Sequence, residues 1–142
     1  MILAGRMLSR RAAVVFGIAN LLTAALVAFG VFAGLPARWW PVDTGAVVLV
    51  VVELSSGVAL LSGTPWAPRL TRVAAAVALA LGLLTVSLAA VTAAWLSGVY
   101  GPVGKGGGIV LALVAALALP YVVVLPAVQL VWLRPRAGED GG

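Results

Sequence analysis

Residues 44–63 read TGAVVLVVVELSSGVALLSG, an unbroken apolar stretch with one ionisable side chain, Glu53, near its middle. Valine or leucine fills the six positions before Glu53. Wound as an α-helix that rises about 1.5 Å per residue, a stretch of this length crosses the roughly 30 Å hydrocarbon core of a bilayer. The stretch therefore predicts a membrane-spanning helix with a single carboxyl inside it.

The composition of the whole chain agrees with a membrane protein. Its 142 residues are 63% hydrophobic and 9% charged, whereas soluble domains are about 45–50% apolar and about 25% charged. The absence of Cys and His excludes disulfides and any metal or haem site held by these residues. We predict a single domain over residues 1–142 with no metal site. The basic residues flank apolar segments, so we expect membrane lipids rather than nucleic acid as partners.

Polar and proline-containing segments divide the chain into four apolar stretches, at residues 12–34, 44–63, 73–98 and 109–133. Each is long enough to cross a bilayer as a helix, and a helix satisfies its own backbone hydrogen bonds in lipid. We therefore predict an all-α fold, a bundle of four transmembrane helices. The segment GPVGKGGG at residues 101–108 is expected to be a flexible outer loop between the third and fourth spans.

Basic residues are distributed unequally between the two ends of these spans. One end holds seven: Arg6, Arg10, Arg11, Arg69, Arg72, Arg134 and Arg136. The other end holds only Arg38 and Lys105. By the positive-inside rule, both termini are expected in the cytoplasm. The abundance of Ala, Gly, Val, Leu and Arg, with a single Lys, further suggests a bacterial chain and hence a multi-pass protein of the bacterial inner membrane.

Glu53 needs a partner or a role, because a charged side chain at the bilayer centre costs about 2.5–3.5 kcal/mol on insertion scales. Counted from the cytoplasmic ends of the predicted spans, Asn20, Thr23, Thr85 and Tyr121 lie at a similar depth, roughly 12–18 Å. We predict that these four side chains meet a neutral Glu53 near the middle of the membrane. Such a layer either joins helices by hydrogen bonds or binds a quinone, a lipid or a proton.

Two basic residues at the sparsely charged end are candidate contacts for lipid headgroups or anions. Lys105 lies among successive glycines before the fourth span, where backbone N–H groups at a helix start attract anions. Arg38 lies in the outer loop beside two tryptophans, and Asp43 is near enough in sequence to form an ion pair with it. No residue is predicted to be catalytic.

The stretch VVELSSGVALLSGTPWAPRLTRVAAAVALALGLLT, residues 51–85, carries a loose pattern: Glu53, Gly57, Leu60 and Gly63, then Thr71-Arg72 and an Ala-rich third span. This pattern resembles the core of the DoxX-like family of small bacterial four-helix membrane proteins, over about a quarter of the chain. The resemblance implies a four-helix bundle with partners in quinone-linked redox or oxidative-stress chemistry. It transfers no catalytic residue.

These features favour a non-enzymatic membrane protein that works as a homo-oligomer or as a subunit of a membrane complex, because small-residue helix faces favour contacts inside the bilayer. Two alternatives stay open. One is a redox accessory protein that binds lipid or quinone at Glu53, and the other is a small oligomeric channel or proton-coupled transporter. No cofactor is predicted apart from that quinone or lipid. An enzyme ranks last, since without His or Cys a nucleophile would need Ser or Thr with Glu53 as base.

Overall fold

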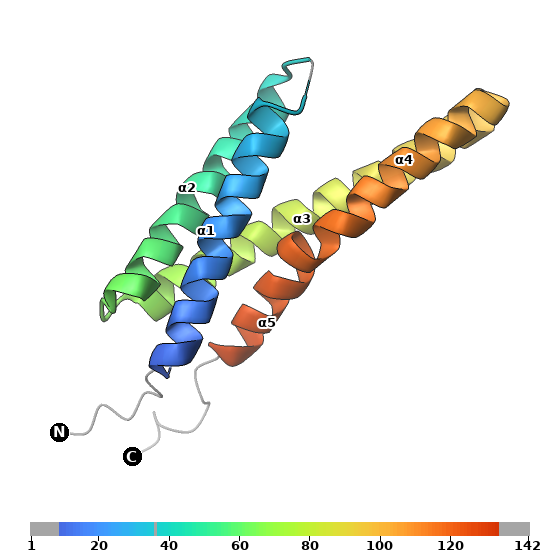
Figure 1. Ribbon diagram of the computed structural model, residues 1–142. Coiled ribbons are helices and arrows are strands. Elements are labelled where there is room, and N and C mark those ends of the chain that lie inside the picture. Colours follow the sequence, from blue (N-terminus) through green and yellow to red (C-terminus); the bar gives the residue numbers. More distant parts are fainter. Residues whose placement is uncertain (1–8, 36, 134–142) are drawn as a thin grey trace.

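The computed structural model describes residues 9–35 and 37–133, which form helices joined by short turns (Figure 1). Their order is α1 (Arg10–Phe32), α2 (Trp40–Ser62), α3 (Ala67–Val99), α4 (Gly101–Leu119), η1 (Pro120–Val124) and α5 (Leu125–Trp132). Four helical runs in this part of the chain are long and apolar enough to span a membrane: α1, α2, α3 and the continuous run Gly101–Trp132. The predicted all-α fold with four candidate spans is confirmed.

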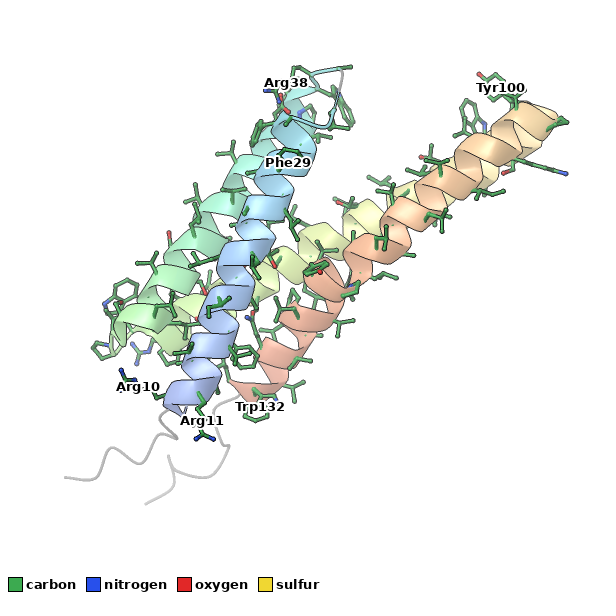
Figure 2. All side chains as sticks on the ribbon, in the orientation of Figure 1. Arg10, Arg11, Phe29, Arg38, Tyr100 and Trp132 are labelled. Carbon is green, nitrogen blue, oxygen red and sulfur yellow. The ribbon has the colours of Figure 1, made fainter. Side chains whose placement is uncertain are left out.

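The helices form two pairs, in which α1 packs along α2 and α3 packs along α4 (Figure 1). The pairs meet at the end where α1 begins, called the convergent end below, and they diverge toward two separate tips. Figure 2 places Arg10, Arg11 and Trp132 at the convergent end, Arg38 at the α1–α2 tip and Tyr100 at the α3–α4 tip. The predicted four-helix arrangement thus holds only where α5 returns along α3 to join α1 and α2.

The helix α3 is much longer than α1 and α2. With 33 residues, α3 is roughly 50 Å long, whereas the 23 residues of α1 and of α2 give roughly 35 Å. When a helix is longer than the thickness of the hydrocarbon core, it can tilt to fit the bilayer. Figure 1 shows α3 and α4 together inclined to the α1–α2 pair.

Prolines and glycines set the ends of the helices. A proline lies in the first turn of three of them: Pro41 in α2, Pro68 in α3 and Pro102 in α4. In a first turn the missing N–H has no intrahelical partner, so proline costs nothing there. Gly63, which ends α2, and Gly101, which follows α3, have positive φ angles of 69° and 57°. Glycine adopts this left-handed conformation without steric cost, so both turns can be tight.

The expectation of a flexible outer loop at residues 101–108 is wrong, because these residues form the first two turns of α4. Tyr100 alone separates α3 from α4. The glycines serve close packing: a Cβ at Gly104 would overlap the carbonyl oxygen of Leu96, and one at Gly108 would lie 2.9 Å from Ser97 Oγ. Small residues at these positions let α4 lie directly against the backbone of α3.

Two further boundaries differ from the expected spans. The third span begins at Ala67, not at residue 73, because the proline after Ala67 suits a first helical turn. Near the other end of the chain, Pro120 removes a backbone donor, and the helix passes through the π turn η1 before α5 begins. At this level α3 comes close to η1, since a Cβ at Gly82 would overlap the carbonyl oxygen of Val122.

Candidate functional site

Polar side chains from four helices are buried together inside the convergent end. The set, called the polar cluster below, consists of Asn20 and Thr23 from α1, Glu53 and Ser56 from α2, Thr71 from α3 and Gln129 from α5. Each of them is at most 1% exposed. The fully buried Ala74 and Ala75 give α3 a small-residue face at the same place, which lets the surrounding helices approach closely.

A chain of hydrogen bonds runs through the polar cluster and connects all four helices. Gln129 Nε2 donates to Asn20 Oδ1 at 2.5 Å, and Asn20 Nδ2 donates to Ser56 Oγ at 2.7 Å. Ser56 Oγ donates to Thr71 Oγ1 at 3.1 Å, and Thr71 Oγ1 donates to the carbonyl oxygen of Ala67 at 2.8 Å. Because buried polar groups gain little unless they are paired, this chain stabilises one relative placement of the helices.

Close contact between α1 and α2 brings Asn20 within reach of Ser56. A Cβ at Gly57 would lie 2.9 Å from the carbonyl oxygen of Gly17, so the two backbones come close there, with the side chain of Leu21 beside them. Asn20 lies one turn beyond Gly17 on the same face of α1. Near the end of α5, Trp132 packs edge-on against Phe16 of α1, with ring centroids 6.3 Å apart.

Glu53 lies one turn from Ser56 on the same face of α2 and is 1% exposed. Its Oε2 atom and the Oε1 atom of Gln129 are buried acceptors that have no hydrogen-bond partner among the described residues. The one ion pair found in that part of the chain joins Arg38 to Asp43, so no basic side chain there neutralises Glu53. A buried acceptor left unpaired costs about 1–3 kcal/mol, which marks these two oxygens as the unusual feature of the cluster.

The structure brings together three of the five residues predicted to form a midplane layer. Asn20, Thr23 and Glu53 belong to the polar cluster, whereas Thr85 and Tyr121 are exposed on the outside of the molecule. The Thr85 hydroxyl donates to the carbonyl oxygen of Leu81 in its own helix at 2.7 Å, and Tyr121 is 44% exposed.

Sequence reasoning missed three members of the cluster as site residues. Ser56 carried a usable signal, since it lies one turn from Glu53 on the same helix face. Thr71 lay in a predicted loop, and Gln129 lay near the predicted end of a span, so neither position pointed to a shared interior. In the structure, Thr71 is in the second turn of α3 and Gln129 is fully buried.

The polar cluster lies near mid-length of α1 and α2 but near the convergent ends of α3 and α5. Asn20 is ten residues from the start of α1, or roughly 15 Å along the helix. Gln129 is three residues from the end of α5, or roughly 5 Å. In the described part of the chain no group of three or more His, Cys, Asp or Glu side chains is placed to hold a metal ion.

The two basic residues predicted to contact headgroups lie at the two tips. Arg38 Nη1 is 3.4 Å from Asp43 Oδ1, which confirms the expected ion pair, and its guanidinium lies 5.1 Å from the centroid of the Phe32 ring. Lys105 is exposed in the first turns of α4. Both side chains are placed where lipid headgroups could reach them, and that contact stays a prediction.

The four apolar spans and their buried polar cluster define a multi-pass integral membrane protein. Comparisons of the chain with protein-family models, with curated proteins and with solved structures found no match.

Proposed function

We propose that this chain is a non-enzymatic integral membrane protein that works as a homo-oligomer, in which a second copy packs against α4. The observation that carries the proposal is the exposure of α4. Only Gly104 and Gly108 of its 19 residues are buried, and both lie against α3. Most other side chains of this helix are exposed, and no further described helix packs along its length.

The chemistry of the α4 surface suits a second copy of the same chain. No charged residue occurs between positions 106 and 133, and the most apolar 18-residue window of the run Gly101–Trp132 has a mean hydropathy of 2.7. A surface without charge cannot form ion pairs with a charged partner. Ala112 and Ala116 are exposed one turn apart, and such a pair of small residues allows two helices to approach closely in a bilayer.

The test is native mass spectrometry after extraction in a mild detergent, with two alanine variants. Ala116→Ile places bulk on the exposed face of α4, and Ala25→Ile places the same bulk on the exposed face of α1 as a matched control. We expect oligomers for the unaltered protein and for Ala25→Ile, and monomers for Ala116→Ile. A monomer for all three, without a copurifying chain, contradicts the proposal. A different protein bound to the unaltered chain indicates a mixed complex instead.

The location and orientation belong to the same proposal. We place the chain in the bacterial inner membrane with the convergent end in the cytoplasm. Basic residues support this orientation: Arg10, Arg11, Arg69 and Arg72 lie on helices near the convergent end, against Arg38 and Lys105 at the tips. The resemblance to the DoxX-like family likewise stays a proposal, supported by the glycine pattern that follows Glu53.

A quinone-binding accessory role has weaker support. The side chains of the polar cluster are at most 1% exposed, so a quinone ring would reach Glu53 only after the surrounding helices had separated. No specific observation favours a channel or a transporter. The side chains of the polar cluster bond to one another and do not line a path between the two ends of the described helices.

A further inference from the structure

We propose that Glu53 and Gln129 form a buried binding site for a single monovalent cation, either a proton or Na⁺, within the polar cluster. The inference goes beyond the proposed function, because it concerns the interior of one chain and holds for a monomer and for an oligomer alike.

Two buried oxygens of the polar cluster lack a hydrogen-bond donor among the described residues. Glu53 Oε2 and Gln129 Oε1 are both buried and both lack a donor. The hydroxyl protons of the cluster are already used: Thr23 donates to Ala19 O at 3.0 Å, Ser56 to Thr71, and Thr71 to Ala67 O. A cation bound between the two oxygens would supply the positive charge that these hydroxyl groups do not.

Among the described residues, no positively charged side chain is buried beside Glu53. Of the charged residues on the helices around Glu53, none is buried: Arg10 and Arg11 on α1, Asp43 on α2, Arg69 and Arg72 on α3. The described part of α5 contains no charged residue. Arg72 Nη1 donates to the carbonyl oxygen of Leu133 at 3.4 Å, so this guanidinium is engaged at the end of α5.

Other oxygen-bearing side chains of the polar cluster are buried on the helices that surround Glu53. Asn20 bonds to Ser56 of α2, which lies one turn from Glu53, and it also bonds to Gln129 of α5. Both α2 and α5 are therefore held against the polar face of α1. Thr23 lies one turn from Asn20 on the same face. Carboxylate, amide and hydroxyl oxygens are the ligands that hard cations prefer. A proton needs only Glu53 as carrier and one oxygen such as that of Gln129 as acceptor.

The proposal predicts that stability depends on the cation through Glu53. A species that binds the folded state better than the unfolded state stabilises the folded state by mass action. If the cation is Na⁺, the melting temperature rises when Na⁺ replaces choline at constant ionic strength. If it is a proton, the folded state holds a proton that an unfolded carboxylate releases at neutral pH. Stability is then highest at low pH and falls as the pH rises.

The experiment measures thermal unfolding in detergent across about pH 5 to 9 and across Na⁺ concentrations. The variants are Glu53→Gln, which keeps the shape of the side chain without its charge, and Asp43→Asn, a control at the far end of the same helix. We expect the pH or Na⁺ dependence to persist in Asp43→Asn and to vanish in Glu53→Gln. An unaltered protein that responds to neither, or a Glu53→Gln variant that responds as the unaltered protein does, overturns the proposal.

A second measurement on the unaltered protein decides the matter if Glu53→Gln does not fold. A hydrophobic carbodiimide adds to a protonated carboxyl, and peptide mass spectrometry locates the adduct. For a Na⁺ site, we expect labelling of Glu53 to slow about tenfold when Na⁺ is at about ten times its Kd, since only about a tenth of the sites stay free. For a proton site, labelling is independent of Na⁺ and slows as the pH rises. Labelling that ignores both Na⁺ and pH contradicts the proposal.

Discussion

Asn20 contributes to two contacts at once, because its amide group bonds to side chains of two other helices. Its nitrogen donates to Ser56 of α2, and its oxygen accepts from Gln129 of α5. It is also fully buried, so water cannot replace either partner. In a membrane, where apolar surface gains little from leaving lipid, hydrogen bonds and close packing decide how helices associate.

Replacing Asn20 by alanine is therefore expected to destabilise the fold by at least about 1 kcal/mol, since two hydrogen bonds of about 0.6 kcal/mol each are lost. Thr85→Ala serves as control, because its exposed hydroxyl bonds only within its own helix. We expect that control to change the free energy of unfolding by less than about 0.5 kcal/mol. Unfolding by a denaturing detergent in mixed micelles measures both, and equal losses would refute the role assigned to Asn20.

At this scale the sequence predicted only part of the candidate site. Asn20, Thr23 and Glu53 were found because each is a rare polar group on an apolar helix. Thr85 was misplaced because its depth was counted from residue 73, and the earlier start of α3 moves it by roughly 9 Å along the helix. Tyr121 was misplaced because it lies within η1, where a π turn changes which side of the helix each residue faces.

At the scale of elements, the α3–α4 pair shows how glycines can join helices as well as separate them. Apolar stretches are predictable from hydropathy, and all four candidate spans were found for that reason. A glycine-rich run is ambiguous, because the same residues suit a flexible loop and a close helix contact. Whether such a run forms a loop or a helix contact depends on the helix that packs against it. That helix cannot be identified from the sequence of the run alone.

Gly104→Ala is expected to separate α4 from α3 at the tip, since the new Cβ would overlap the carbonyl oxygen of Leu96. Gly106→Ala is the matched control, because a Cβ there meets nothing within 4 Å. This control should keep the pair intact and favour the helix by up to about 1 kcal/mol. Hydrogen exchange of backbone amides at residues 93–108 should quicken in Gly104→Ala alone. Unchanged exchange would show that α4 does not depend on this contact.

At the scale of the whole molecule, the absence of cysteine allows a direct test of orientation. Pro65→Cys places a thiol in the exposed turn between α2 and α3, and Val103→Cys places one at the α3–α4 tip, where the valine is 84% exposed. With the convergent end in the cytoplasm, a membrane-impermeant maleimide added to intact cells should label position 103 and spare position 65. The reverse pattern would invert the proposed orientation.

The length of α3 has a consequence for how the protein responds to its lipids. A helix that exceeds the hydrocarbon core stands more upright when that core thickens and leans further when it thins. Because α4 packs along α3, we expect the pair to move together, whereas α1 and α2, at roughly 35 Å, are closer to the thickness of the core. We therefore expect the angle between the two pairs to change with the length of the acyl chains around them. A change in bilayer thickness would then change the shape of this protein without any ligand.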